Sequence, residues 1–209
     1  MAYNSNIHHR RSIRLKGYDY SQAGLYFITI CVQNKICLFG NIENTEMILN
    51  DAGKIANECW LEIPNHFPNA VLHEHIVMPN HVHGIIELQQ NNFGANVGAE
   101  NFLPLQQPPS LQPPSSLPQP PGEPPKNEFQ KMIPRSIGSI VKGFKIGVTK
   151  WFRNNRTNNA GAKNFLPQQP VWQRNYWEHI IRNEQSYQHI SDYIINNPSK
   201  WKDDKFYKL

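Results

Sequence analysis

The stretch AVLHEHIVMPNHVHGIIEL (residues 70–88) holds two apolar, β-branched runs that are separated by a Pro-Asn pair. Pro and Asn are turn-forming residues, so the stretch predicts a hairpin with strands at 70–78 and 81–88. Alternate side chains of a strand project from the same face, which places His81 and His83 side by side. Two such imidazoles are metal ligands or polar residues on the solvent side of a sheet, and one strand alone does not decide between them.

The residues around this hairpin predict a mixed α+β protein. Aromatic and β-branched residues alternate in GLYFITICVQ (24–33), which is typical of a strand. Apolar residues recur at helical spacing in three other segments, and Asn50 and Asn183 are suitable N-caps for two of them. In all, strands are predicted at 24–33, 37–42, 46–49, 70–78 and 81–88, a strand or extended segment at 171–183, and helices at 50–63, 136–155 and 184–197. This order predicts an α+β sandwich with helices on one face of a mainly antiparallel sheet.

Residues 89–134 differ sharply in composition from the rest of the chain. The segment is rich in Pro, Gln and Ser, as in LPLQQPPSLQPPSSLPQPPGEPPK, and such sequences do not bury enough apolar surface to fold. We therefore expect one domain, built from residues 1–88 and 135–209, that is interrupted by a disordered insertion at 89–134.

Composition and charge narrow the class of protein. The 209 residues contain no apolar run long enough for a membrane span and no apolar segment near the N-terminus, so we expect a cytoplasmic protein. The three cysteines form no Cys-x-x-Cys pair, which argues against a disulfide framework and against a cysteine-based zinc site. The net charge of +5 permits a polyanionic partner.

Basic residues gather in two places along the chain. The N-terminal arm contains Arg10, Arg11, Arg14 and Lys16. The predicted helix at 136–155 contains Lys142, Lys145 and Arg153. In the helix, these residues lie on the stripe opposite its apolar residues. A basic stripe on a lone helix is most often a solvated surface. Beside a metal site, the alternative is contact with phosphate groups.

The last predicted helix supplies a candidate third ligand and a candidate reactive group. Tyr193 and Asn197 are four residues apart and therefore share a helical face. Asn197 precedes Pro198, which places it at the helix end, where its amide oxygen is a plausible metal ligand. Two histidines with oxygen ligands suit Mg²⁺ or Mn²⁺ bound to a phosphate. The alternatives are that Tyr193 is a core residue and that Asn197 simply ends the helix.

Together these residues suggest covalent chemistry on a phosphodiester. A phenol is a weak nucleophile at neutral pH, and a divalent ion that polarises the phosphodiester would assist its attack. The product would be a phosphotyrosine bond to one DNA end and a free hydroxyl on the other. The ester would retain the energy for rejoining without a nucleotide cofactor. His73 and His75 have the same spacing in HEH, but no further chemistry accompanies them in the sequence.

Four blocks occur in a fixed order along the chain: GYDYSQAGLYFITICVQNK (17–35), IVMPNHVHGII (76–86), VWQRNYWEHIIRN (171–183) and DYIINNP (192–198). In this combination the chain resembles the REP-associated tyrosine transposases, single-tyrosine transposases of the HUH nuclease superfamily. The resemblance covers nearly the whole chain except about 89–134 and part of 155–170. It implies a ferredoxin-like α+β fold in which His81 and His83 are metal ligands on the central strand. It further implies that Tyr193 is the nucleophile and that Asn197 is the third ligand, where related transposases commonly have Gln.

The resemblance also implies a substrate and a reaction. Members act on single-stranded DNA that contains hairpins, so we expect sequence-specific nicking and rejoining in DNA transposition, with Mg²⁺ or Mn²⁺ as cofactor. Base stacking and a basic groove would hold the strand, for which Arg174 and Trp177 are candidates together with the basic arm and helix. The chain would act as a monomer or a homodimer. The alternatives are a non-catalytic DNA-binding protein that keeps the fold and a metal-dependent hydrolase without a covalent step.

Overall fold

The computed structural model describes residues 18–90, 133–155 and 170–207 of the chain. Nearly all of the predicted insertion at 89–134 and the whole basic N-terminal arm lie outside the described residues, so both stay predictions. Within the described residues, no helix is long and apolar enough to cross a bilayer.

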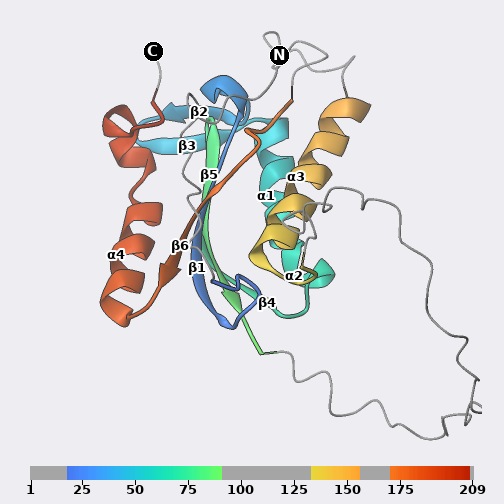
Figure 1. Cartoon of the computed structure of the whole chain (residues 1–209). Helices are drawn as coiled ribbons and strands as arrows, with labels where there is room; N and C mark the ends of the chain where they lie inside the picture. The colour runs from blue at the N-terminus through green and yellow to red at the C-terminus, as the bar shows by residue number, and fades with distance from the viewer. Residues whose placement is uncertain (1–17, 91–132, 156–169, 208–209) are drawn as a thin grey trace, which may run out of the picture. The chain divides into compact units, whose positions relative to one another are not determined.

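Four strands form one antiparallel sheet, which crosses the centre of Figure 1. They are β1 (Gly24–Cys31), β4 (Ala70–Met78), β5 (His81–Leu88) and β6 (Trp177–Ile181), in the spatial order β4-β5-β1-β6. Helix α1 (Asp51–Leu61) follows β1 and helix α3 (Ile137–Asn154) follows β5, which gives the strand–helix–strand–strand–helix–strand order of a ferredoxin-like fold. The predicted α+β class is therefore confirmed.

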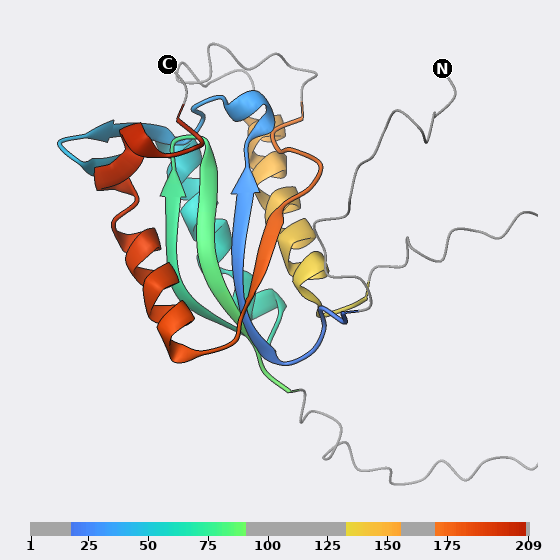
Figure 2. The ribbon, with the colours of Figure 1, turned by 60° about the vertical axis from the view of Figure 1, so that its left-hand side comes forward.

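Helices cover both faces of this sheet, as Figure 2 shows. Helices α1 and α3 pack on one face and form the main core with β1 and β5. Helix α4 (Glu184–Ile195) packs on the other face, where Ile194 clusters with Ile85 of β5 and Ile181 of β6. The expectation that helices cover a single face is therefore corrected: α4 has a buried apolar stripe of its own. Because α4 contains Tyr193, this second face is where the predicted chemistry lies.

Strand β5 divides its side chains between the two faces. Val82 and Ile86 point into the main core with α1 and α3. His81, His83 and Ile85 alternate with them and point toward α4. Gly84 belongs to the core face, where a Cβ atom would collide with the ring of Trp60. The glycine after the two histidines thus makes room for a large core side chain rather than for a turn.

Most remaining elements follow their predicted bounds, but β6 (Trp177–Ile181) covers only part of the segment predicted at 171–183, and before it Trp172 forms an isolated bridge with Val32. The side chains of Asn50 and Asn183 cap α1 and α4, because they accept hydrogen bonds from the backbone of Gly53 and Ser186. Strands β2 (Gly40–Glu43) and β3 (Glu46–Leu49) form a separate hairpin before α1, and a short helix η1 (Gln33–Lys35) follows β1. Pro64 lies in the first turn of a second short helix, α2 (Ile63–His66). The 3₁₀ helix η5 (Pro198–Asp203) continues the chain after α4.

Candidate functional site

His81 and His83 lie side by side on β5, both buried, with ring centroids 4.4 Å apart. The hydroxyl of Thr29 on the neighbouring strand β1 lies 2.8 Å from Nδ1 of His83. The side-chain oxygen of Asn80, in the turn before β5, lies 2.9 Å from Nδ1 of His81. Each imidazole is therefore held through Nδ1, which leaves its Nε2 atom for another partner.

The hydrogen bonds of Asn80 determine which nitrogen of His81 carries the proton. The Asn80 amide nitrogen donates to the carbonyls of Lys35 and Phe206, so the amide oxygen faces His81 and can only accept. His81 Nδ1 must then carry the proton. Its Nε2 atom presents a lone pair that is buried and has no hydrogen-bond partner. A buried lone pair of this kind is suited to binding a metal ion.

Helix α4 brings Tyr193 to the two histidines. The phenol oxygen lies 3.2 Å from Nε2 of His83 and 3.2 Å from a carboxylate oxygen of Asp204. The Tyr193 ring meets Phe27 of β1 edge-on, with centroids 6.2 Å apart, and the residue is 36% exposed. The predicted nucleophile and the predicted ligands therefore meet within one chain, at a position that a macromolecular substrate can reach.

Asp204, just after η5, belongs to the site although no pattern in the sequence predicts it. One carboxylate oxygen lies 3.2 Å from the Tyr193 oxygen and accepts a hydrogen bond from Asn197 Nδ2 at 3.2 Å. Together with the histidines, Asp204 places three potential ligand atoms within 4.8 Å of one another. In the sequence, nothing in KDDKF distinguishes Asp204 from Asp203. Only the return of the chain to the sheet after α4 makes the difference.

Asn197 also reaches this site. Its side chain is 2% exposed, and its amide oxygen is buried without a hydrogen-bond partner. An unsatisfied buried oxygen is costly, and coordination to a metal ion would satisfy it. The role of Asn197 as third ligand stays a prediction. We call the five residues that meet here the tyrosine site: His81, His83, Tyr193, Asn197 and Asp204.

Burial controls protonation in the tyrosine site. It lowers the pKa of His81 and of His83, and the mutual repulsion of the two rings lowers that of His83 further, so both are neutral at neutral pH. Burial also raises the pKa of Tyr193 to about 12, with the Asp204 carboxylate adding to the rise and the hydrogen bond to Asn197 opposing it. The phenol is therefore protonated at neutral pH, and its attack on a substrate requires removal of that proton.

The donors of the tyrosine site fit a divalent metal ion. Neutral imidazole nitrogens and a carboxylate suit a divalent ion such as Mn²⁺, and two buried atoms, His81 Nε2 and Asn197 Oδ1, lack partners. Asn80 and Thr29 hold the imidazoles in the way that metal-bound histidines are commonly held. The residues present therefore fit the metal that the sequence predicted.

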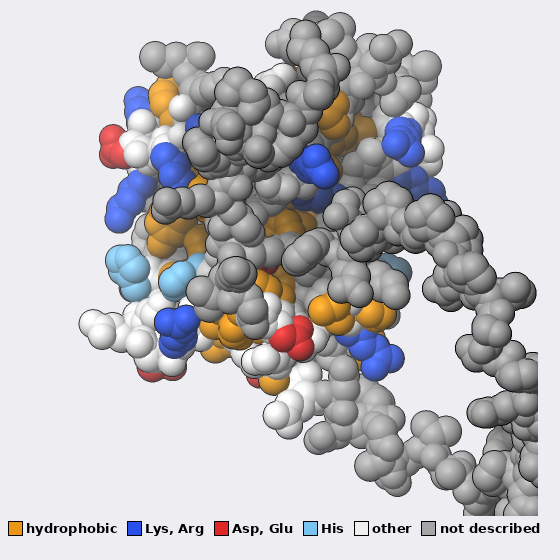
Figure 3. All heavy atoms as spheres, in the orientation of Figure 1, with side chains coloured by type: hydrophobic (Ala, Val, Ile, Leu, Met, Phe, Trp, Pro, Cys, Tyr) orange, Lys and Arg blue, Asp and Glu red, His pale blue; other side chains and the backbone are white. Residues whose placement is uncertain are grey.

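The predicted DNA-contacting residues lie on different sides of the sheet. Trp177 of β6 is opposite Thr29 in the register, on the face of the histidines, and is 52% exposed. Lys142 and Arg153 are exposed on α3, which packs on the other face. Figure 3 shows Lys and Arg side chains near η5 and near the end of α3 on the viewed face. These DNA contacts stay predictions.

Lys145 has a structural role in addition to the predicted one. Its ammonium group donates to the carbonyls of Gln173 and Asn175, at 2.9 and 3.1 Å, and burial lowers the pKa of Lys145 to about 8. The lysine thereby joins α3 to the segment before β6, which contains the exposed Arg174. As phosphate contacts, Lys145 and Arg174 stay predictions, and two carbonyls compete for the protons of Lys145.

The pair His73 and His75 shows why the spacing of two histidines is a weak signal by itself. A bulge in β4 between Leu72 and His75 interrupts the alternation of side chains. His73 lies 3.1 Å from the hydroxyl of Tyr187 on α4, whereas His75 lies 3.0 Å from the side chain of Asn57 on α1. The two imidazoles are therefore on opposite faces of the sheet and do not share a ligand.

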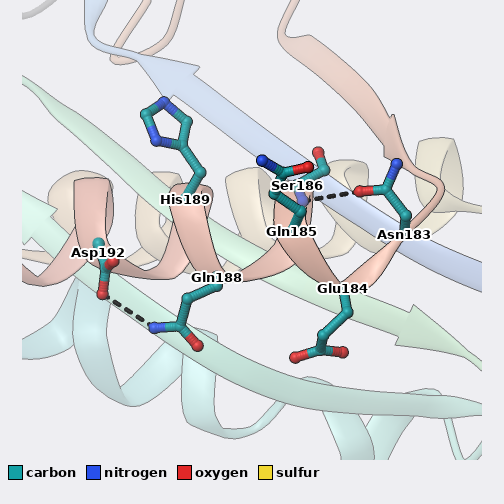
Figure 4. Close-up of a pocket in the computed structure, with 7 residues that line it drawn as sticks. All are labelled: Asn183, Glu184, Gln185, Ser186, Gln188, His189 and Asp192. Atoms are coloured by element: carbon teal, nitrogen blue, oxygen red, sulfur yellow. Dashed lines mark hydrogen bonds between the residues drawn. The ribbon is translucent and has the colours of Figure 1, made fainter.

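A shallow pocket on the outer side of α4 does not include the tyrosine site (Figure 4). Its lining consists of polar and charged residues from the N-cap onward: Asn183, Glu184, Gln185, Ser186, Gln188, His189 and Asp192. Hydrogen bonds pair several of these residues with one another, such as Gln188 with Asp192 at 3.0 Å. We interpret this pocket as a solvated helix surface.

Comparison with known proteins identifies relatives of this chain, although no family model matches it. An uncharacterised protein of Haemophilus influenzae is 46% identical over 205 residues, which cover 98% of this chain and 97% of that protein. A second Haemophilus influenzae protein, provisionally named a REP-associated tyrosine transposase, is 22% identical over 87% of this chain and 74% of its own length. The REP-associated tyrosine transposase of Escherichia coli is 46% identical over 66 residues, or 31% of this chain and 36% of that protein.

Among solved structures, a REP-associated tyrosine transposase bound to a REP hairpin matches with a TM-score of 0.48 and 19% identity. The match covers 90% of this chain and 74% of that one.

Proposed function

We propose that this chain, which is similar to REP-associated tyrosine transposases, nicks and rejoins single-stranded DNA in transposition. The proposed intermediate is a covalent bond between Tyr193 and a 5′ phosphate. The observation that carries the proposal is the position of the Tyr193 oxygen, 3.2 Å from both His83 Nε2 and Asp204. A protein that only bound DNA would need neither an accessible phenol nor an unpartnered imidazole lone pair beside it.

In the proposed reaction, the Tyr193 oxygen attacks the phosphorus of a phosphodiester, and the bond between phosphorus and the 3′ oxygen breaks. The phenol proton passes to the carboxylate of Asp204, which already lies at hydrogen-bond distance. The departing 3′ oxygen takes up a proton from water and becomes a hydroxyl. In rejoining, a 3′ hydroxyl attacks the phosphotyrosine and releases its proton to water, the bond between phosphorus and the tyrosine oxygen breaks, and Asp204 returns its proton to the phenol.

The metal ligands in this proposal are His81 and His83, with an oxygen ligand from Asp204 or Asn197. When bound, the ion would offset charge that develops on the non-bridging phosphate oxygens. The two imidazoles already have the orientation and the neutral state that a metal ligand needs, because Asn80 and Thr29 orient them through Nδ1 and burial lowers their pKa.

The proposed substrate is a single strand with a hairpin beside the cut. Trp177 presents an exposed ring on the face of the histidines, where an unpaired base can stack on it. The Lys205 ammonium lies 6.0 Å from the centre of that ring and offers positive charge for a phosphate. We propose a hairpin in the substrate because the resemblance to the REP-associated tyrosine transposases implies one.

A covalent adduct tests this function directly. The full-length protein is incubated with Mn²⁺ and a pool of hairpin strands with randomised flanks, labelled at the 3′ end because that fragment stays on the tyrosine. On a denaturing gel, we expect a labelled band at the size of protein plus DNA. The band should be absent with Tyr193→Phe and present with Tyr207→Phe, which removes a phenol oxygen elsewhere in the C-terminal segment.

Each outcome distinguishes the proposal from its alternatives. Cleavage that persists in Tyr193→Phe would contradict the covalent mechanism and would support a metal-dependent hydrolase. Binding of hairpin strands without cleavage or adduct by the wild-type protein would support a non-catalytic DNA-binding protein.

A further inference from the structure

His73 and its neighbour Glu74 both face α4 because of the bulge in β4. Between Leu72 and His75, β4 contains one residue more than the facing part of β5. His73 and Glu74 therefore both lie opposite Ile85, and both side chains project from the same face of the sheet as Ile85. Without the bulge, one of these two polar side chains would point into the main core.

Glu74 binds two residues of α4. Its Oε2 atom accepts hydrogen bonds from the hydroxyls of Tyr187 and Ser191, each at 3.0 Å. These two donors are four residues apart, so they lie on one face of the helix in successive turns. Ser191 is buried and lies two residues before Tyr193.

His73 extends this network across the sheet. Its ring lies 3.1 Å from the Tyr187 hydroxyl on one side and 3.0 Å from a carboxylate oxygen of Glu87 on the other. Burial acts to raise the pKa of Glu74, but hydrogen bonds from its own backbone, Tyr187 and Ser191 outweigh burial and lower it. Glu74 is therefore a carboxylate at neutral pH, which makes both hydrogen bonds from α4 charge-assisted.

Apart from these hydrogen bonds and the contact of Tyr193 with His83, α4 packs on the sheet through apolar side chains, as in the cluster of Ile85, Ile181 and Ile194. Apolar packing stabilises the helix on the sheet but is non-directional, so by itself it permits small rotations and sliding. Hydrogen bonds depend steeply on distance and angle and therefore fix a helix in one orientation. Tyr193 needs such an orientation, because its oxygen must stay beside His83.

We propose that Glu74 is a positioning residue for Tyr193. By holding Tyr187 and Ser191, Glu74 fixes the rotation and the height of α4 on the sheet, and with them the place of the phenol in the tyrosine site. Only the catalytic consequence rests on the proposed function. A displacement of about 1 Å at a reacting atom can reduce a rate by about 10²-fold.

Three variants remove this anchor, and a fourth is a control in the same helix. Glu74→Ala removes the acceptor, whereas the double variant Tyr187→Phe/Ser191→Ala removes both donors and leaves the strand intact. Gln188→Ala removes the hydrogen bond to Asp192 on the outer side of α4 (Figure 4). A triple variant combines the first two sets.

Hydrogen exchange of the backbone amides tests the anchor without any need for activity. In the full-length protein, we expect the amides of α4 to exchange about tenfold faster in Glu74→Ala and in the double variant, and at the wild-type rate in Gln188→Ala. The triple variant should exchange at the rate of the double variant, because Glu74→Ala then removes an acceptor whose two donors in α4 are already absent. Amides of α3 are the internal reference. Exchange of α4 at the wild-type rate in the double variant would overturn the proposal.

The rate of adduct formation tests the consequence for Tyr193. In a single turnover at saturating hairpin DNA, we expect the rate constant to fall about tenfold or more in the double variant and to stay at the wild-type value in Gln188→Ala. DNA affinity should change less than about twofold. A reduced amplitude with an unchanged rate constant would indicate a purely structural role and would overturn the proposal. If the wild-type protein forms no adduct, the proposed function fails, and hydrogen exchange alone decides whether Glu74 anchors α4.

Discussion

The substitution Asp204→Asn isolates one chemical function of the tyrosine site. In the structure, one Asp204 oxygen lies 3.2 Å from the Tyr193 phenol, and the other accepts a hydrogen bond from the backbone amide of Phe206 at 2.6 Å. An asparagine keeps the shape of the side chain, and its amide oxygen can keep the bond to Phe206. It does not accept a proton. The substitution therefore removes the proton acceptor of Tyr193, together with the acceptor of the Asn197 amide, while the bond to Phe206 keeps the C-terminal segment in place.

Two effects of opposite sign follow, and their sizes decide the outcome. With a pKa of about 12 for Tyr193, only about one phenol in 10⁵ is ionised at pH 7. Removing the carboxylate lowers this pKa, but burial is the larger cause of the rise and remains, so the gain in phenolate is well below about 100-fold. Loss of a general base costs about 10² to 10⁴-fold. The net effect is a fall in the rate of adduct formation of at least about tenfold.

Single-turnover formation of the 3′-labelled adduct, at saturating protein and Mn²⁺, measures this rate. Asp203→Asn is the matched control, because Asp203 is the adjacent acid and is exposed. We expect the control to react at the wild-type rate. The rate of Asp204→Asn should also increase with pH in the alkaline range, because hydroxide then replaces the missing base.

Two results would refute this reasoning. A rate for Asp204→Asn within about threefold of the wild type would mean that the carboxylate does not accept the proton. Full recovery of the rate at high Mn²⁺ concentration would mean that Asp204 acts as a metal ligand alone.

Two further predictions concern the histidines. His81→Ala should abolish adduct formation but change the affinity for hairpin DNA, measured by gel shift, by less than about twofold, because the imidazole supplies a metal ligand rather than a DNA contact. His189→Ala, on the outer side of α4, is the control. Unchanged cleavage in His81→Ala would remove His81 from the metal site. Burial lowers the pKa of both histidines in the folded chain, so in metal-free buffer their contribution to stability is complete above about pH 6.5, the unfolded value, and is lost as the pH falls. Urea unfolding should show a loss of about 2 kcal/mol from His81 between pH 6.5 and 5, and a loss of the same sign from His83, because the unfolded chain takes up protons that the folded chain does not. A His81→Asn/His83→Asn variant with the same acid dependence would contradict this assignment.

Local patterns in the sequence predicted most elements of the fold. The bounds of β4 and β5 agree with the hairpin that the apolar runs on either side of Pro-Asn predict. The predicted N-caps Asn50 and Asn183 precede the first residues of α1 and α4. These features depend on residues close together in the chain, which is why they are visible in the sequence. The face on which α4 lies was predicted wrongly, because its apolar stripe matches either side of the sheet.

The two pairs of alternating histidines separate what the sequence by itself determined from what only the tertiary structure decided. Regular alternation in β5 determined that His81 and His83 share a face, and helical spacing determined that Tyr193 and Asn197 lie together. The same alternation failed for His73 and His75, because a bulge depends on pairing with β5 and is not encoded in HEH alone. Asp204 was decided by the tertiary structure as well. Asn80 binds the carbonyl of Phe206, 126 positions away, and this contact brings the C-terminal segment back over the histidines. A contact between residues so far apart leaves no local spacing that a sequence can show.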